Sequence, residues 1–196
     1  MNTLTCKKLK NYYIKDKKSA ADIAKILNLS ETGVNYWLKK FNIQKRTVSE
    51  AIYVKHNPKG DPFKFVLPKN LEDSKLFGLG IGLYWGEGTK ADKGSVRLGN
   101  SDPAIMRVFI KFLIKFFQID KKDFKFHLHT FTDIDLTEAK EYWKKELKIK
   151  EEQFYKPTIT ITGKLGSYRK KSKYGVLTIY YANTKLRNIL VNLLPM

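Results

Sequence analysis

The chain of 196 residues contains one cysteine, has few acidic residues and lacks any long apolar run. Because Cys6 has no second cysteine beside it, an internal disulfide and a thiolate metal site are both excluded, which favours a reducing environment. No apolar segment approaches the roughly 20 residues of a membrane span, and residues 1–20 lack the apolar centre of a secretion signal. We therefore expect a cytoplasmic protein without a membrane partner.

Acidic residues are outnumbered two to one: 19 Asp and Glu stand against 38 Lys and Arg, which leaves a net charge of +19. Residues 1–60 carry 13 basic and 4 acidic side chains, and residues 61–196 carry 25 and 15, so both parts are basic. Such a charge favours a polyanion as the partner, with duplex DNA or RNA first. The hydrophobic content of 42% is enough for a buried core, which excludes a disordered basic tail.

The composition changes between residues 44 and 70, where Pro58, Gly60, Pro62 and Pro68 interrupt helical patterns. Helical spacing dominates before this stretch, whereas helices and alternating strands mix after it. We predict a small N-terminal domain (1–50), a linker (51–70) and a larger domain (71–196).

Residues 19–41 predict two short helices separated by a tight turn. Ser19 with Asp22 forms a capping-box-like start, Asn28 and Leu29 break the first helix, and Ser30 can cap the second. This segment resembles the helix-turn-helix superfamily, and a helix over residues 4–15 would complete a three-helix core.

The second of these helices would then read DNA. Asn35 can pair with adenine in the major groove, whereas Lys39, Lys40 and Arg46 suit phosphates. Thr32 and Tyr36 share the outward face. An exposed polar face without a ligand and a protein-docking module remain the alternatives.

Glycine recurs at every fourth position in the segment 76–89, as Gly78, Gly82 and Gly86. Glycine costs roughly 1 kcal/mol per residue in a helix relative to alanine, so three on one face make sense if another helix approaches closely. A buried strand would not explain the four-residue spacing, and a dinucleotide-binding loop would need glycine in place of Leu83. We expect a face on which another helix packs closely.

The core of this segment, GIGLYWGEG over 80–88, resembles the motif of the LAGLIDADG family of homing endonucleases and related regulators. Gly82 and Gly86 match the family's small interface positions, and Glu87-Gly88 matches its terminal acid-glycine pair. The resemblance implies that two such helices pack at a twofold axis. It also implies that Glu87, together with Gly88, binds a divalent metal.

The same resemblance implies an α+β fold, with a small all-α domain followed by an αββαββα domain with an antiparallel sheet. A further helix is expected near 136–149, and a short first strand near 89–91. Alternation and capping predict the remaining elements in a matching order: strands at 95–100, 124–131, 156–163 and 176–181, and helices at 103–117 and 184–194.

Alternation also predicts which side chains face away from the core. Phe124, Phe126, Leu128, Ile159 and Ile161 are expected to point inward. The opposite face would present polar side chains to base edges and phosphates, unless it is an ordinary solvated surface. Its members are Arg97, Lys125, His127, His129, Thr160 and Thr162. A zinc site on the two histidines lacks an obvious third ligand.

Residues 164–173 hold five basic side chains between two strands, so a basic loop is expected to reach phosphates through Arg169, Lys170 and Lys171. Its other interpretation is a solvated loop. Lys164 and Lys173, at its two ends, are candidates for stabilising a charged transition state.

These observations favour sequence-specific binding of double-stranded DNA. The family resemblance adds Mg²⁺-dependent phosphodiester cleavage by a homodimer, in which each chain supplies one Glu87. A regulator that binds DNA without cutting it is the main alternative, since Tyr84 and Trp85 depart from the family's motif. RNA binding stays open as a further alternative, and a small-molecule enzyme would need a catalytic cluster that the sequence does not show.

Overall fold

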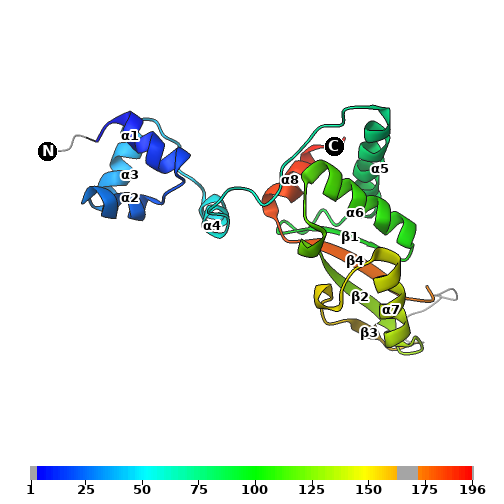
Figure 1. The fold of residues 1–196 in the computed structure, drawn as a ribbon. Coiled ribbons are helices and arrows are strands. Elements are labelled where there is room, and N and C mark those ends of the chain that lie inside the picture. Colours follow the sequence, from blue (N-terminus) through cyan, green and yellow to red (C-terminus); the bar gives the residue numbers. More distant parts are fainter. Residues whose placement is uncertain (1–3, 163–171, 196) are drawn as a thin grey trace. The chain divides into compact units, whose positions relative to one another are not determined.

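The computed structural model describes residues 4–162 and 172–195, and the chain divides into two compact units, Met1–Pro62 and Phe63–Met196 (Figure 1). The division falls inside the predicted linker. Residues 63–66 pack with the second unit, because Phe63 is buried and Phe65 stacks on Phe117 at a ring-centroid distance of 5.1 Å. The backbone of Lys64 donates a hydrogen bond to the carbonyl of Phe117.

The first unit is entirely helical. Its elements are α1 (Cys6–Lys10), the π-helix η1 (Asn11–Lys15), α2 (Ala20–Leu27), α3 (Glu31–Lys40) and α4 (Val48–His56). The predicted capping of α2 is confirmed, since Ser19 and Asp22 bond each other's backbone N–H groups. Asn28 adopts a left-handed conformation (φ 53°) that ends α2, and Ser30 caps α3 by accepting from the Gly33 N–H.

One hydrophobic cluster holds α1, η1, α2 and α3 together. Leu9, Ile23, Val34 and Leu38 are fully buried in it, and Trp37 packs at its border. α4 begins in the last residues of the predicted N-terminal domain, runs into the predicted linker and has no buried residue. Its start is set by a capping box between Thr47 and Glu50, a signal that the sequence contains ahead of Pro58.

The second unit mixes helices with a four-stranded sheet. Its elements are α5 (Leu71–Glu87), β1 (Val96–Asn100), α6 (Pro103–Phe117), η2 (Lys121–Asp123), β2 (Lys125–Phe131), α7 (Leu136–Leu147), η3 (Glu151–Gln153), β3 (Thr158–Thr160), β4 (Val176–Tyr181) and α8 (Thr184–Asn192). The helix predicted at 103–117 is confirmed at both ends. No described helix combines the length and apolar character that crossing a membrane requires.

The predicted antiparallel sheet is wrong in one pairing. The strand order is β1-β4-β2-β3, and β4 runs antiparallel to both of its neighbours, but β3 runs parallel to β2. The chain between these strands contains α7, a crossover of the kind that parallel strands need. The predicted short strand at 89–91 is also absent; only Gly88 forms an isolated bridge, with Leu98.

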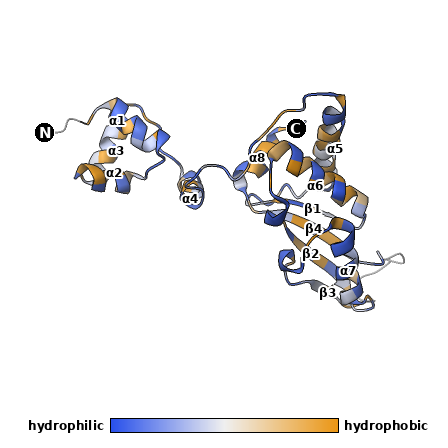
Figure 2. Cartoon of the chain, in the orientation of Figure 1, coloured by the Kyte–Doolittle hydropathy of each residue, from blue (hydrophilic) through white to orange (hydrophobic). Residues whose placement is uncertain are grey.

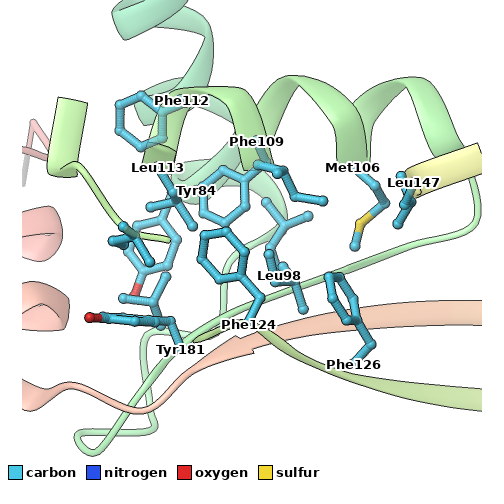
Figure 3. Close-up of a cluster of buried hydrophobic side chains, with 14 of the residues drawn as sticks. Tyr84, Leu98, Met106, Phe109, Phe112, Leu113, Phe124, Phe126, Leu147 and Tyr181 are labelled. Atoms are coloured by element: carbon cyan, nitrogen blue, oxygen red, sulfur yellow. The ribbon is translucent and has the colours of Figure 1, made fainter. Parts of the chain in front are cut away.

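A single core lies between one face of the sheet and the helices. Alternate residues of β1, β2 and β4 are buried, and they join the same cluster as the apolar faces of α6, α7 and α8 (Figure 3). Hydrophobic residues recur at helical spacing along α6, which supplies seven buried side chains (Figure 2). The other face of the sheet is left outside this core.

α5 packs on α6 through a glycine. A Cβ atom built on Gly80 would overlap the ring of Phe112, whereas one built on Gly82 would meet nothing within 4 Å. Beyond Gly80, Tyr84 is fully buried and stacks parallel to Phe109, with a centroid distance of 6.1 Å. The ion pair between Asp73 and Lys115 joins the same two helices near the start of α5.

We predict that two alanine substitutions on α5, two residues apart, change the free energy of unfolding in opposite directions. Gly80→Ala should lower the free energy of unfolding by roughly 1–3 kcal/mol, because the new methyl group displaces Phe112. Gly82→Ala should raise it by up to about 1 kcal/mol, because the helix gains propensity without a clash. Urea unfolding followed by circular dichroism measures both, and equal effects would contradict the packing described here.

Candidate nucleic-acid interface

α3 turns one polar face to the solvent. Thr32, Lys39 and Lys40 are exposed, Asn35 is partly exposed, and the ring of Tyr36 is 59% exposed. The burial of Val34 and Leu38 fixes this orientation, since these residues lock the opposite face into the core. The Lys40 ammonium lies 4.7 Å from the ring centroid of Trp37, so this cation is held against an aromatic face.

Arg46 serves the fold of the first unit. Its guanidinium donates hydrogen bonds to the backbone carbonyls of Tyr13 and Lys18 and lies 4.3 Å from the ring centroid of Tyr13. The Arg46 N–H also donates to the Tyr13 hydroxyl, at 2.9 Å. The chain after α3 is thereby tied to η1, a role that the sequence analysis did not predict.

On the sheet, the face opposite the core carries most of the predicted ligand-binding residues. Burial alternates along β2, which places Lys125, His127 and His129 together on this open face. The Nε2 atom of His127 lies 2.9 Å from Thr158 Oγ1, and that of His129 lies 2.7 Å from Thr160 Oγ1. Two histidine–threonine pairs therefore join β2 to β3.

Two side chains predicted to point inward from the strand at 156–163 are exposed. Ile159 and Ile161 are 49% and 57% exposed, so that expectation is wrong. β3 spans residues 158–160, lies at the edge of the sheet and supplies no buried residue to the core cluster, and Ile161 follows it. Thr162 donates to Asp133 at 2.7 Å and bonds Thr132, which attaches the end of this segment to the turn after β2.

The two cations on the open face have partners within the chain. Arg97 pairs with Asp92 and donates to Ser95 Oγ at 2.7 Å, and Lys125 donates to the backbone carbonyl of Glu152 at 2.9 Å. The backbone N–H of Gly94, with the charge of Arg97, lowers the pKa of Asp92, so this carboxylate stays ionised.

Two aromatic side chains of this region escaped the sequence analysis. Tyr180 lies on the open face of β4, and Tyr155 contacts it with a ring-centroid distance of 5.6 Å. The alternation of β4 could have revealed Tyr180. No local signal marks Tyr155, whose position depends on the backbone hydrogen bond from its N–H to the carbonyl of Phe126.

The acid of the glycine-rich helix is at its C-terminal end. Glu87 is exposed, and Gly88 follows it as the C-cap. Cβ atoms built on Gly78, Gly82 and Gly86 would meet nothing within 4 Å, so this face of α5 packs against no described part of the chain. The apolar side chains of Leu79 and Trp85 are also exposed, at 57% and 51%.

The predicted lysines are not gathered around Glu87 in the described residues. The Lys173 ammonium lies 4.9 Å from the ring centroid of Tyr174. The hydrogen bond with Tyr174 raises the pKa of Lys173 most, and the charge of Glu138 on α7 raises it further. Lys164, Arg169, Lys170 and Lys171 lie outside the described residues.

The sequence matches no model of a known protein family and no curated protein, and the structure matches no solved structure. We therefore infer function from the residues themselves.

We predict that His127 titrates below the ordinary histidine value of about 6.5. Burial lowers its pKa first, and the neighbouring His129 lowers it further. A lowered histidine pKa means that the unfolded chain binds the proton more readily, so stability should fall as pH drops through this range. Proton NMR of the imidazole gives the midpoint, and His129→Gln should move it upward. A midpoint at or above the ordinary value would contradict this assignment.

Proposed function

We propose that the protein binds double-stranded DNA in a sequence-specific manner as a homodimer, with α3 in the major groove. The observation that carries the proposal is the solvent-facing side of α3, where an amide and lysines stand on a rigid, capped helix of a chain with net charge +19. A helix fits the major groove, and a basic chain gains affinity by releasing counterions from the phosphates.

Three exposed or partly exposed side chains of α3 have a role in this proposal. Asn35 can bond the N6 and N7 atoms of adenine, while Thr32 contacts a thymine methyl group or a phosphate. Lys39 neutralises a phosphate. Arg46, which bonds two backbone carbonyls, contributes by holding α3 in place rather than as a free cation.

The exposed face of α5 supports the proposed dimer. Gly78, Gly82 and Gly86 would let a second copy of the helix approach closely, and Leu79 and Trp85 would be covered by it. A twofold axis along this face would bring two Glu87 carboxylates together, as in the LAGLIDADG family, and would place two α3 helices on a pseudo-palindromic site.

Glu87 fits the role of a Mg²⁺ ligand in one respect. Its carboxylate is exposed at the end of α5, and carboxylate oxygen is a ligand that Mg²⁺ prefers. A bound Mg²⁺ would supply an activated water and neutralise charge on the leaving oxygen. Glu87 would hold the ion, and the backbone of Gly88, fixed by its bridge to Leu98, would keep Glu87 beside the sheet.

A regulator that binds DNA without cutting it is the second candidate. The observation in its favour is the position of Lys173, which contacts Tyr174 and faces Glu138 instead of Glu87. A cutting enzyme would then need a basic side chain other than Lys173 to stabilise the charged transition state.

We predict distinct effects from two substitutions on α3. Asn35→Ala should cost about 1–3 kcal/mol at one base pair and relax specificity there. Lys39→Ala should weaken binding to all duplexes and reduce the slope of log K against log salt by about 1. Selection of bound sequences from random duplex DNA, followed by anisotropy titrations at several salt concentrations, measures both.

The control for these titrations is Lys145→Ala, which removes an exposed lysine from α7. It should leave sequence preference unchanged. The assignment of α3 would be overturned if Lys145→Ala and Asn35→Ala altered specificity alike.

We predict that Glu87→Gln and Gly82→Arg separate cutting from assembly. Glu87→Gln keeps the size of the side chain, so it should remain dimeric and bind DNA but produce no cut ends in Mg²⁺. Gly82→Arg places a bulky cation on the open face of α5, so it should be a folded monomer that also fails to cut. Sedimentation and sequencing of cut ends measure the two outcomes. Tight binding without cutting by the unsubstituted protein would identify the regulator instead.

A further inference from the structure

Four side chains form an aromatic and cationic cluster on the open face of the sheet: Arg97, His127, Tyr155 and Tyr180. Tyr180 is the centre of this cluster. The Arg97 guanidinium lies 4.8 Å from its ring centroid, Tyr155 contacts it edge-on at 5.6 Å, and His127 does so at 6.5 Å. One residue each from β1, β2 and β4, and one residue ahead of β3, therefore bring three rings and a cation together.

Most polar side chains of the open face already form hydrogen bonds or ion pairs within the chain. Arg97 bonds Ser95 and Asp92, and Lys125 bonds the carbonyl of Glu152. The Nε2 atoms of His127 and His129 bond threonine hydroxyls. Reading base pairs in a major groove requires donors and acceptors that reach base edges, and on this face most of them already have partners.

The ring of Tyr155 remains accessible. Tyr155 is 46% exposed, and its neighbour Lys156 is exposed as well. In a duplex the bases are stacked on one another and offer only their edges to a protein. Unpaired bases offer their faces, and aromatic side chains on a sheet are the platforms on which such bases stack.

We propose that the open face of the sheet binds unpaired nucleotides, which stack on Tyr155 and the Tyr180 cluster while Lys156 contacts a phosphate. The inference rests on the proposed function only in taking a nucleic acid as the ligand. It adds that the second unit binds this nucleic acid where its bases are unpaired. Single-stranded DNA and single-stranded RNA share this chemistry. Arg97 holds Tyr180 by a cation–π contact and stacks its guanidinium plane on a base.

Charge favours a nucleic acid over an apolar partner at this face. Two acidic residues of this region have cationic partners: Asp92 pairs with Arg97, and the Glu152 carboxylate lies 3.7 Å from the Lys150 ammonium. The charges of Lys125 and Lys156 therefore add to a face whose carboxylates are already partly neutralised. A strand with phosphates along one side and bases along the other matches both this charge and the rings of the cluster.

The test uses the full chain and a labelled strand of about 12 nucleotides, within the range of single-strand sites on such platforms. Four probes are compared by anisotropy: the DNA strand, the RNA strand of the same sequence, the DNA duplex, and an abasic DNA strand that keeps the phosphates. We expect the abasic strand to bind more weakly than the normal strand. Either order of DNA and RNA supports the proposal and identifies the source of the strand.

The variants separate stacking from charge. Tyr155→Leu should weaken binding of the single strand by about 5- to 150-fold, the range for loss of one stacked base, and leave the duplex unchanged. Tyr155→Phe should retain the affinity, because it keeps the ring. Because Tyr155 is half exposed, Tyr155→Leu is expected to fold, and its unfolding curve confirms this.

The matched control is Tyr36→Leu, which removes an exposed ring from α3. It should affect the duplex and leave the single strand unchanged. Equal binding of the abasic and normal strands, or unchanged single-strand binding by Tyr155→Leu, would overturn the inference. A protein that binds single strands through Tyr155 but ignores the duplex would overturn the proposed function alone.

Discussion

The packing of α6 against both α5 and the sheet is the constraint on which the second unit depends. α6 buries four phenylalanines in the core cluster, and three of these rings contact Phe77 or Tyr84 of α5. Phe112 comes so close to the α5 backbone that position 80 has to be glycine. Asp73 then fixes the other end of the contact through Lys115, whose hydrogen bond lowers the pKa of Asp73.

This one-sided core determines what remains for binding. The buried apolar positions of β1, β2 and β4 join the core cluster with α6, α7 and α8, so the opposite face keeps the alternate residues, which are mostly polar or aromatic, with Val176 as an apolar exception. Likewise, Gly80 and Tyr84 of α5 face the core, whereas Gly78, Gly82 and Gly86 lie outside it. Both candidate surfaces are consequences of the same packing, because a helix or strand that buries one face exposes the other.

The sequence was a good guide where the signal is local. Ser19 with Asp22 predicted the start of α2, Ser30 predicted that of α3, and capping predicted the start of α6, where Asp102 caps the helix ahead of Pro103. It failed where the outcome depends on distant residues. The direction of β3 depends on the crossover through α7, and the exposure of Ile159 depends on the place of β3 at the edge of the sheet. Alternation gives the two faces of a strand but not what covers them.

The candidate sites show the same limit. Residue type alone made Arg46 and Lys125 look like phosphate ligands, but each donates to backbone carbonyls that lie far away in the sequence. Tyr155 could not be placed at all, since contacts with Phe126, which is far away in the sequence, bring it beside Tyr180. Partners of this kind decide whether a cation is free for a ligand, and no periodicity in the chain encodes them.

Two nucleic-acid surfaces on one chain have an energetic consequence. If α3 holds a DNA site as proposed, binding by the sheet would become intramolecular, so the local concentration of the nucleic acid would be set by the chain between the units rather than by the solution. Modest stacking on Tyr155 and Tyr180 would then be enough to bind a second stretch of the same nucleic acid. In this proposal, base edges would be read by a helix that keeps its amide and lysine side chains exposed, and base faces would be bound by a sheet whose histidine and threonine side chains already bond each other. Each surface thus uses the groups that the fold leaves available to it.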